Sequence, residues 1–142
     1  MKIGSLLAHV RELETQFAGE LRAAAERHRD DHDVYHQSHT FAVTADKRIE
    51  KLEPLARRYG GQAEWKTAIG EGSDELLEDL RALYLRAEEN AITWVMLCQA
   101  AKAARDQELL TLATECQAET EMQGKWFTTR IKTGAPQALV VA

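Results

Sequence analysis

Hydrophobic residues recur at three- and four-residue steps along most of the chain, which is the spacing of one face of an α-helix. The first stripe predicts a helix from about Ser5 to Arg27, with Ser5 as its N-cap. Its apolar positions are Leu6, Val10, Leu13, Phe17, Leu21 and Ala24. The second stripe predicts a helix from about Asp31 to Tyr59, formed by Val34, Phe41, Ala45, Ile49, Leu52 and Ala56. Pro54 either kinks this helix or ends it, because proline removes an intrahelical hydrogen bond.

Two more stripes follow a pair of glycines, Gly60 and Gly61. The third helix is expected to start at the capping sequence Ser73-Asp74-Glu75-Leu76 and to run to about Arg105. Asp106 then caps a fourth helix that ends before Gly134 and Pro136. Its apolar positions are Leu109, Ala113, Cys116, Phe127 and Ile131. A shift of 75 residues places Asp31 on Asp106 and the second stripe on the fourth, which is a weak internal repeat.

These elements predict an all-α fold, a four-helix bundle made of two antiparallel helical hairpins. The turns near residues 29–31 and 105–106 are short, whereas the crossover at 60–72 could span about 40 Å, enough to travel the length of the bundle. We therefore expect one domain over residues 1–142, with hairpins at about 5–59 and 73–133 and a tail at 134–142. The apolar end of the tail, 138–142, is expected to pack on the bundle.

Composition narrows the class of protein. The net charge is −5 and the chain is 44% hydrophobic, so it can bury a core but offers no concentrated basic face for nucleic acid. Neither a signal peptide nor a run of about 20 apolar residues occurs, which predicts a cytoplasmic protein without a membrane partner. Cys98 and Cys116 fall inside amphipathic patterns and are expected in the core rather than in a disulfide.

Two short segments resemble the ferritin-like superfamily, particularly its small bacterial stress-induced members with two hairpins. The segment Leu83-Tyr84-Leu85-Arg86-Ala87-Glu88 is similar to a Leu-Tyr-x-Ala-Glu element of that branch, and Glu119-Thr120-Glu121 followed by Gln123 is similar to its Glu-Thr-Glu-x-x-Gln segment. The resemblance covers most of the chain. It implies a ferritin-like bundle with a stress-associated role.

The di-metal site of that superfamily requires Glu-x-x-His pairs on two helices. No Glu in this chain is followed by His three residues later, and residues 73–133 contain no histidine. We therefore expect a degenerate or absent di-metal site and no cofactor, with Glu88 and Glu119 as relics of the ligand set. The alternative is a metal-binding protein that holds Fe, Mn or Zn.

A series of histidines offers a second metal candidate. His28, His32, His36 and His39 are spaced by four and three residues, which makes them neighbours on a helix, and imidazoles at i,i+4 can chelate a transition metal. His32, His36 and His39 are expected opposite the buried stripe, facing solvent or another subunit, whereas His28 could cap the inner face of the first helix. The series is thus a polar outer face, an intersubunit metal site or a pH-sensitive interface.

The third predicted helix carries a second apolar seam, Leu85, Ile92 and Met96, on the side away from its core stripe. An exposed apolar patch is unfavourable in water, so this seam predicts a homodimer or larger assembly that buries it. Alternatively, the crossover covers the seam through Trp65 and Ile69.

Enzyme signatures are missing from the sequence. Gly70-Glu71-Gly72 lacks the lysine and the strand of a phosphate loop, and acidic residues such as Glu14, Glu20, Glu115 and Glu121 read as solvated helix flanks. We therefore expect a non-enzymatic, self-associating structural or stress-associated interaction protein, whose further protein partner the sequence does not identify. A carrier of apolar ligands in the bundle interior, near Trp94, Cys98, Cys116 and Phe127, is a third hypothesis.

Overall fold

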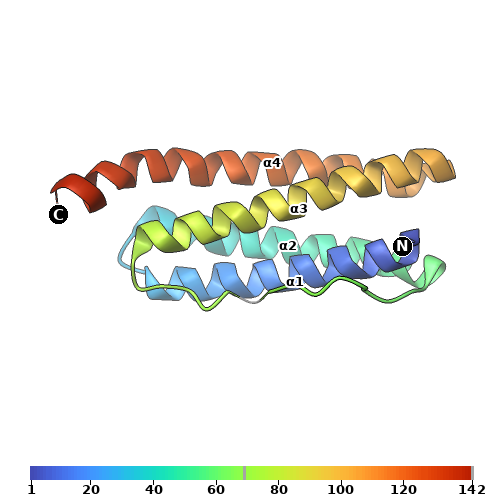
Figure 1. Ribbon diagram of the computed structural model, residues 1–142, viewed down its shortest axis with the longest axis horizontal. Helices are drawn as coiled ribbons and strands as arrows, with labels where there is room; N and C mark the ends of the chain where they lie inside the picture. The colour runs from blue at the N-terminus through green and yellow to red at the C-terminus, as the bar shows by residue number, and fades with distance from the viewer. Residues whose placement is uncertain (69, 142) are drawn as a thin grey trace.

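The computed structural model describes residues 1–68 and 70–141. It contains four long helices, α1 (Ile3–Arg27), α2 (His32–Tyr59), α3 (Leu76–Ala104) and α4 (Gln107–Pro136), and a short π-helical turn, η1 (Gln137–Val141). The expected all-α four-helix bundle of two hairpins is confirmed. Figure 1 shows the hairpin α1–α2 lying against the hairpin α3–α4, with the crossover running back along α1. Among the described residues, no helix is both long and apolar enough to span a membrane.

The core consists of two apolar clusters, one toward each end of the bundle. The first is built around Leu7, Leu52, Trp94 and Leu109, and the second around Phe17, Leu21, Ala45, Leu80 and Phe127. Between them lies a layer of buried polar side chains that includes Glu14, Arg48, Asn90, Thr120 and Gln123. The helices therefore pack as amphipathic stripes, as expected, but the stripes are interrupted at mid-length by polar residues.

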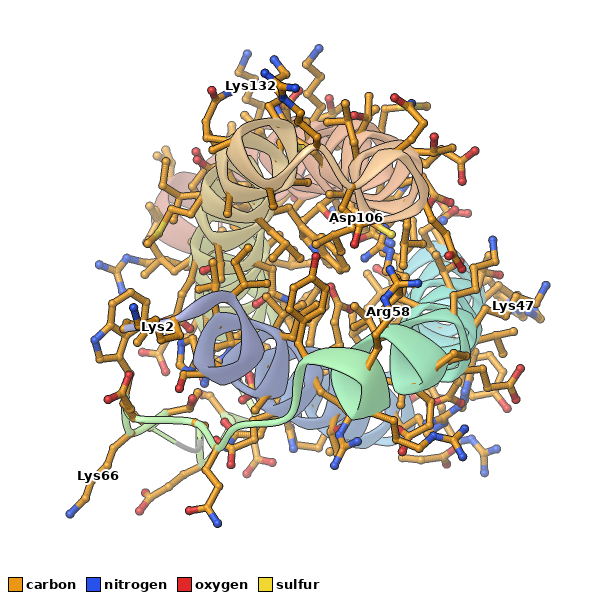
Figure 2. The ribbon with its side chains drawn as sticks, turned by 90° about the vertical axis from the view of Figure 1, so that its right-hand side faces the viewer. Lys2, Lys47, Arg58, Lys66, Asp106 and Lys132 are labelled. Carbon is orange, nitrogen blue, oxygen red and sulfur yellow. The ribbon has the colours of Figure 1, made fainter. Side chains whose placement is uncertain are left out.

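Both interhelical turns are closed by an aspartate that serves as an N-cap and also binds the other hairpin. Asp31 accepts a hydrogen bond from the Val34 amide and pairs with Arg130 of α4. Asp106 accepts from the Leu109 amide at 3.0 Å, and Arg58 of α2 donates to it at 2.7 Å. Figure 2 shows Arg58 and Asp106 at the end of the bundle, reaching toward each other between the two hairpins.

These hydrogen bonds and ion pairs lower the pKa of both N-cap carboxyl groups. The hydrogen bond from the Tyr59 hydroxyl, 2.6 Å long, is the largest influence on Asp106 and lowers the pKa of its carboxyl. Burial opposes ionisation of Asp31, but the Val34 amide and Arg130 outweigh it and lower its pKa as well. Both N-caps are therefore held as carboxylates, the form that a helix N-terminus favours.

Helix α1 begins very close to the end of α2. A β-carbon added at Gly4 would lie 1.8 Å from the carbonyl oxygen of Gly60, so only glycine fits at this crossing. Gly60 itself follows α2 with φ = 68°, in the left-handed region that favours glycine. These two glycines bring the N-terminus of the chain onto the C-terminal end of α2.

Two predicted helix starts were wrong. Helix α1 begins at Ile3, before Ser5, and its N-cap Lys2 makes no side-chain hydrogen bond. Helix α3 begins at Leu76 rather than Ser73, because the Ser73 hydroxyl accepts from the Glu75 amide and holds that segment as a turn. The predicted end of the second helix at Tyr59 is confirmed: α2 continues through Pro54, so this proline does not end it.

The C-terminal end also differs from expectation. Helix α4 passes through Gly134 to Pro136 and continues into the π-helical turn η1; good helix formers, Ala135 and Ala138, flank the proline. Leu139, Val140 and Val141 are strongly exposed, so the described part of the tail does not pack on the bundle. Figure 1 shows this end extending past the other helices.

Candidate functional site

The outer face of α3 carries an apolar stripe that the bundle leaves uncovered. Leu85, Ile92 and Met96 retain 47%, 59% and 40% of their accessible surface. The seven- and four-residue steps between them place all three on the side of α3 opposite Leu80, Leu83, Ala87, Trp94 and Ala101, which are buried. Below, we call Leu85, Ile92 and Met96 the α3 stripe.

The described part of the crossover, residues 60–68 and 70–72, does not cover this stripe. The Trp65 ring lies edge-on against His9 of α1, with 5.0 Å between ring centroids, and the Ala68 carbonyl accepts a hydrogen bond from Arg86. Ile69, the other residue expected to cover the stripe, lies outside the described residues. The described crossover therefore packs on α1 and on the flank of α3.

A charged network occupies the polar layer between the two core clusters. Arg48 Nη1 lies 3.3 and 3.4 Å from the two carboxylate oxygens of Glu14 and 3.4 Å from Oε1 of Gln123. Trp94 Nε1 donates to Glu14 Oε1 at 2.9 Å, and Arg48 Nε lies 3.8 Å from Glu119. All four helices thus contribute one contact or more to a single buried ion pair.

Burial governs the charge of this network. Because the Glu14 carboxyl is withdrawn from water, its pKa is raised, although Arg48 and the Trp94 hydrogen bond act to lower it. Glu14 was expected on a solvated helix flank, and this was wrong: the residue has no exposed surface. A buried carboxylate of this kind requires a nearby cation, and Arg48 is that cation.

The residues of the polar layer do not fit a di-metal centre. A guanidinium already lies between Glu14 and Glu119, where it would repel a metal ion, and the described residues contain no cluster of three or more His, Cys, Asp or Glu side chains that could hold one. Glu119 lies on the side of α4 that faces Arg48 of α2. Glu88 of α3 lies against Gly124, which is five residues after Glu119 and therefore about 140° around α4 from it. The structure therefore does not bring these two candidates to one centre.

The histidines divide between two sides of α2. His32 and His36 are exposed, their rings are nearly parallel with centroids 6.4 Å apart, and both line a cleft toward α4 together with Asp33. His39 turns the other way, with Nε2 3.5 Å from Glu26 of α1. Only His32 and His36 could therefore act as a pair.

His28 belongs to a different contact, at the end of α1. It is buried, and its Nε2 lies 2.6 Å from Asp79 Oδ2 of α3. Asp79 also accepts a hydrogen bond from Arg27 and, through Oδ1, from the Ser73 amide at 2.8 Å. This cluster fastens the end of the crossover to α1, and the sequence alone did not reveal Asp79 as its centre.

Both cysteines are free and buried, as expected. Burial raises the pKa of the Cys116 thiol to about 12, so it remains protonated and a poor nucleophile near neutral pH. Trp94, Cys98, Cys116 and Phe127 are all packed within the two core clusters. The interior near them is thus filled with side chains, which does not favour the carrier hypothesis.

Comparisons with known proteins add no relative. No family model, curated protein or solved structure matches this chain. The functional argument therefore rests on the residues themselves.

Proposed function

We propose that this chain is a ferritin-like helical bundle without di-metal chemistry, and that it acts as a self-associating structural or stress-associated interaction protein. The fold class and the two motif-like segments support the ferritin-like assignment, and the stress association derives from that resemblance alone. The Glu14–Arg48 pair supports the loss of metal chemistry, because the guanidinium supplies the positive charge that buried carboxylates would otherwise take from metal ions.

The observation that carries self-association is the exposure of the α3 stripe. Its three large apolar side chains follow one another along one helix face, whereas Val43, Trp65 and Met122 stand singly on other elements. Single exposed hydrophobic residues are normal on protein surfaces, but a contiguous apolar face indicates a contact surface. A contact limited to one helix per chain is small, so we expect a dissociation constant in the micromolar range.

Sedimentation velocity over a range of concentrations tests this function. Ile92→Asp places a charge in the contact and is expected to weaken the dimer by on the order of 100-fold, while circular dichroism still reports a folded bundle. Met122→Asp is the matched control, because Met122 is 69% exposed on α4 and should leave the dimer intact. A wild-type chain that stays monomeric at high concentration, or equal effects of the two variants, would count against the proposal.

Metal binding at His32 and His36 is a second candidate, favoured by their parallel rings one turn apart in the same cleft. Such a pair would hold zinc or another transition metal with water completing the shell. Titration with zinc should show binding to the wild type that His36→Ala removes and His39→Ala leaves unchanged. Equal zinc binding by wild type and His36→Ala would refute this site.

A further inference from the structure

Helices α2 and α4 leave a groove between them over the second core cluster. It consists of two clefts, of about 360 and 290 Å³, which share Gln37, Thr40 and Trp126. The first cleft also contains His32 and His36, whose imidazole rings can accept hydrogen bonds. Clefts of this size are suited to small molecules. The groove shares no residue with the α3 stripe, so its occupant does not depend on self-association.

The polar lining of this groove favours a ligand that brings its own hydrogen-bond donors. The hydroxyl groups of Thr40, Thr44 and Thr133 each donate to a carbonyl oxygen of their own helix. Because a hydroxyl group has one proton, only its lone pairs remain for a ligand. The guanidinium of Arg130, which also lines the groove, is paired with Asp31.

A carboxylate lies toward each end of the groove. Asp33 is exposed in the first cleft, and Glu119, whose side chain is 53% exposed, lines the second. Arg48 lies 3.8 Å from Glu119 but is shared with Glu14, so one guanidinium serves two carboxylates. Lys47 of α2 lines neither cleft, and Figure 2 shows its side chain directed away from the bundle. The groove thus retains negative charge at both ends.

An aromatic wall lies between the two carboxylates. Trp126 lines both clefts, and the Phe41 ring stands edge-on to it with 5.9 Å between ring centroids. Aromatic faces attract cations and also pack against methylene chains. Glu119 and Arg130, which lines the Asp33 end, are eleven residues apart on α4, so the two ends of the groove are separated by about 16 Å.

We propose that this groove binds a linear aliphatic polyamine. Its terminal ammonium groups pair with Asp33 and Glu119, and its methylene chain lies across Trp126. An ammonium group has several N–H donors and no acceptor, which matches a lining that offers acceptors. The threonine hydroxyl groups accept from the inner ammonium groups. The net charge of −5 on the whole chain also attracts a polycation.

Isothermal titration calorimetry with spermine in low-salt buffer tests this site. Spermine should bind with one-to-one stoichiometry, and butylamine, which has a single ammonium group, should bind on the order of tenfold more weakly. Asp33→Asn and Glu119→Gln should each weaken spermine binding by about threefold to fivefold. Glu121→Gln is the matched control, because it makes the same charge change on α4 at a position about 160° around the helix from Glu119.

Tryptophan fluorescence provides an independent measurement of where spermine lies. Trp126→Phe keeps an aromatic wall but should remove the fluorescence change that spermine causes in the wild type, because Trp65 and Trp94 lie outside the groove. A change that persists in this variant would overturn the proposed site. Equal losses of affinity in Glu119→Gln and Glu121→Gln would also overturn it, since they would show attraction to the overall negative charge alone. Absence of spermine binding to the wild type would overturn it outright.

Discussion

Replacing Arg48 by methionine tests how the buried polar layer is stabilised. Methionine keeps much of the side-chain volume but leaves the Glu14 carboxylate with only the Trp94 hydrogen bond in the described network. Breaking a buried ion pair by removing one partner costs about 3–5 kcal/mol of the free energy of unfolding. Arg11→Met is the matched control, because Arg11 pairs with Glu53 across the same two helices but at the surface, with both side chains more than 40% exposed. That variant should cost less than about 1 kcal/mol.

The pH dependence identifies the mechanism. The folded-state pKa of Glu14 is already raised, so stability from this group is fully present below its unfolded pKa and is lost as pH rises through the folded value. Removing Arg48 takes away an interaction that lowers the pKa of Glu14. The folded protein without Arg48 therefore loses more stability as the pH rises. The destabilisation of Arg48→Met should thus be largest at neutral pH and should shrink toward pH 5, by at most about 1.4 kcal/mol per pH unit.

Urea unfolding followed by circular dichroism at about pH 7.5 and pH 5 provides the measurement. The double variant Glu14→Gln, Arg48→Met should recover most of the lost stability, because it removes the buried charge and leaves an amide that can still accept from Trp94 Nε1. If Arg48→Met costs no more than Arg11→Met, or if its cost does not change with pH, the guanidinium does not compensate Glu14.

Two further predictions concern the joints between the helices. Gly4→Ala should lower the free energy of unfolding by about 1–3 kcal/mol, because the added β-carbon meets the Gly60 carbonyl. Gly19→Ala, in the same helix, places its β-carbon in open space and should raise the free energy of unfolding by about 0.5–1 kcal/mol. Thermal unfolding of both variants measures these changes, and equal effects of the two variants would contradict the prediction. Asp106→Ala should cost about 1–3 kcal/mol and Asp106→Asn less, since asparagine still caps α4. Because the folded pKa of Asp106 is lowered, its contribution is present above its unfolded pKa and is lost as pH falls through the folded value, so unfolding of Asp106→Asn should respond less to acid below about pH 4.

The sequence predicted the elements well because their signals are local. Apolar spacing and helix caps are read from neighbouring residues. The N-cap at Asp106 is confirmed, and of the two aspartates in the first turn, Asp30 and Asp31, the cap is Asp31. The expected helix start at Ser73 and the expected helix end before Gly134 were wrong, because several local arrangements at a helix terminus are close in free energy. Exposure of the α3 stripe was also predicted from spacing, since residues opposite a core stripe point outward.

The polar layer was missed, although a signal existed. Glu14 lies between Val10 and Phe17, and Arg48 lies between Ala45 and Leu52, each at positions that belong to the buried stripe. A polar residue at such a position indicates a buried charge. Which residue it meets depends on how far one helix is displaced along the next, and this is set by packing across the bundle rather than by spacing within a helix.

The aspartate caps also bear on how the two halves of the chain are related. Asp31 of the first hairpin pairs with Arg130 of the second, and Asp106 of the second pairs with Arg58 of the first. Each hairpin thus contributes one carboxylate and one guanidinium to the contact between them. This reciprocity is the hallmark of an isologous dimer, in which the same contact is made twice about an axis. The chain is thus organised like a dimer of hairpins joined covalently, and the crossover serves mainly to keep the two halves at high effective concentration.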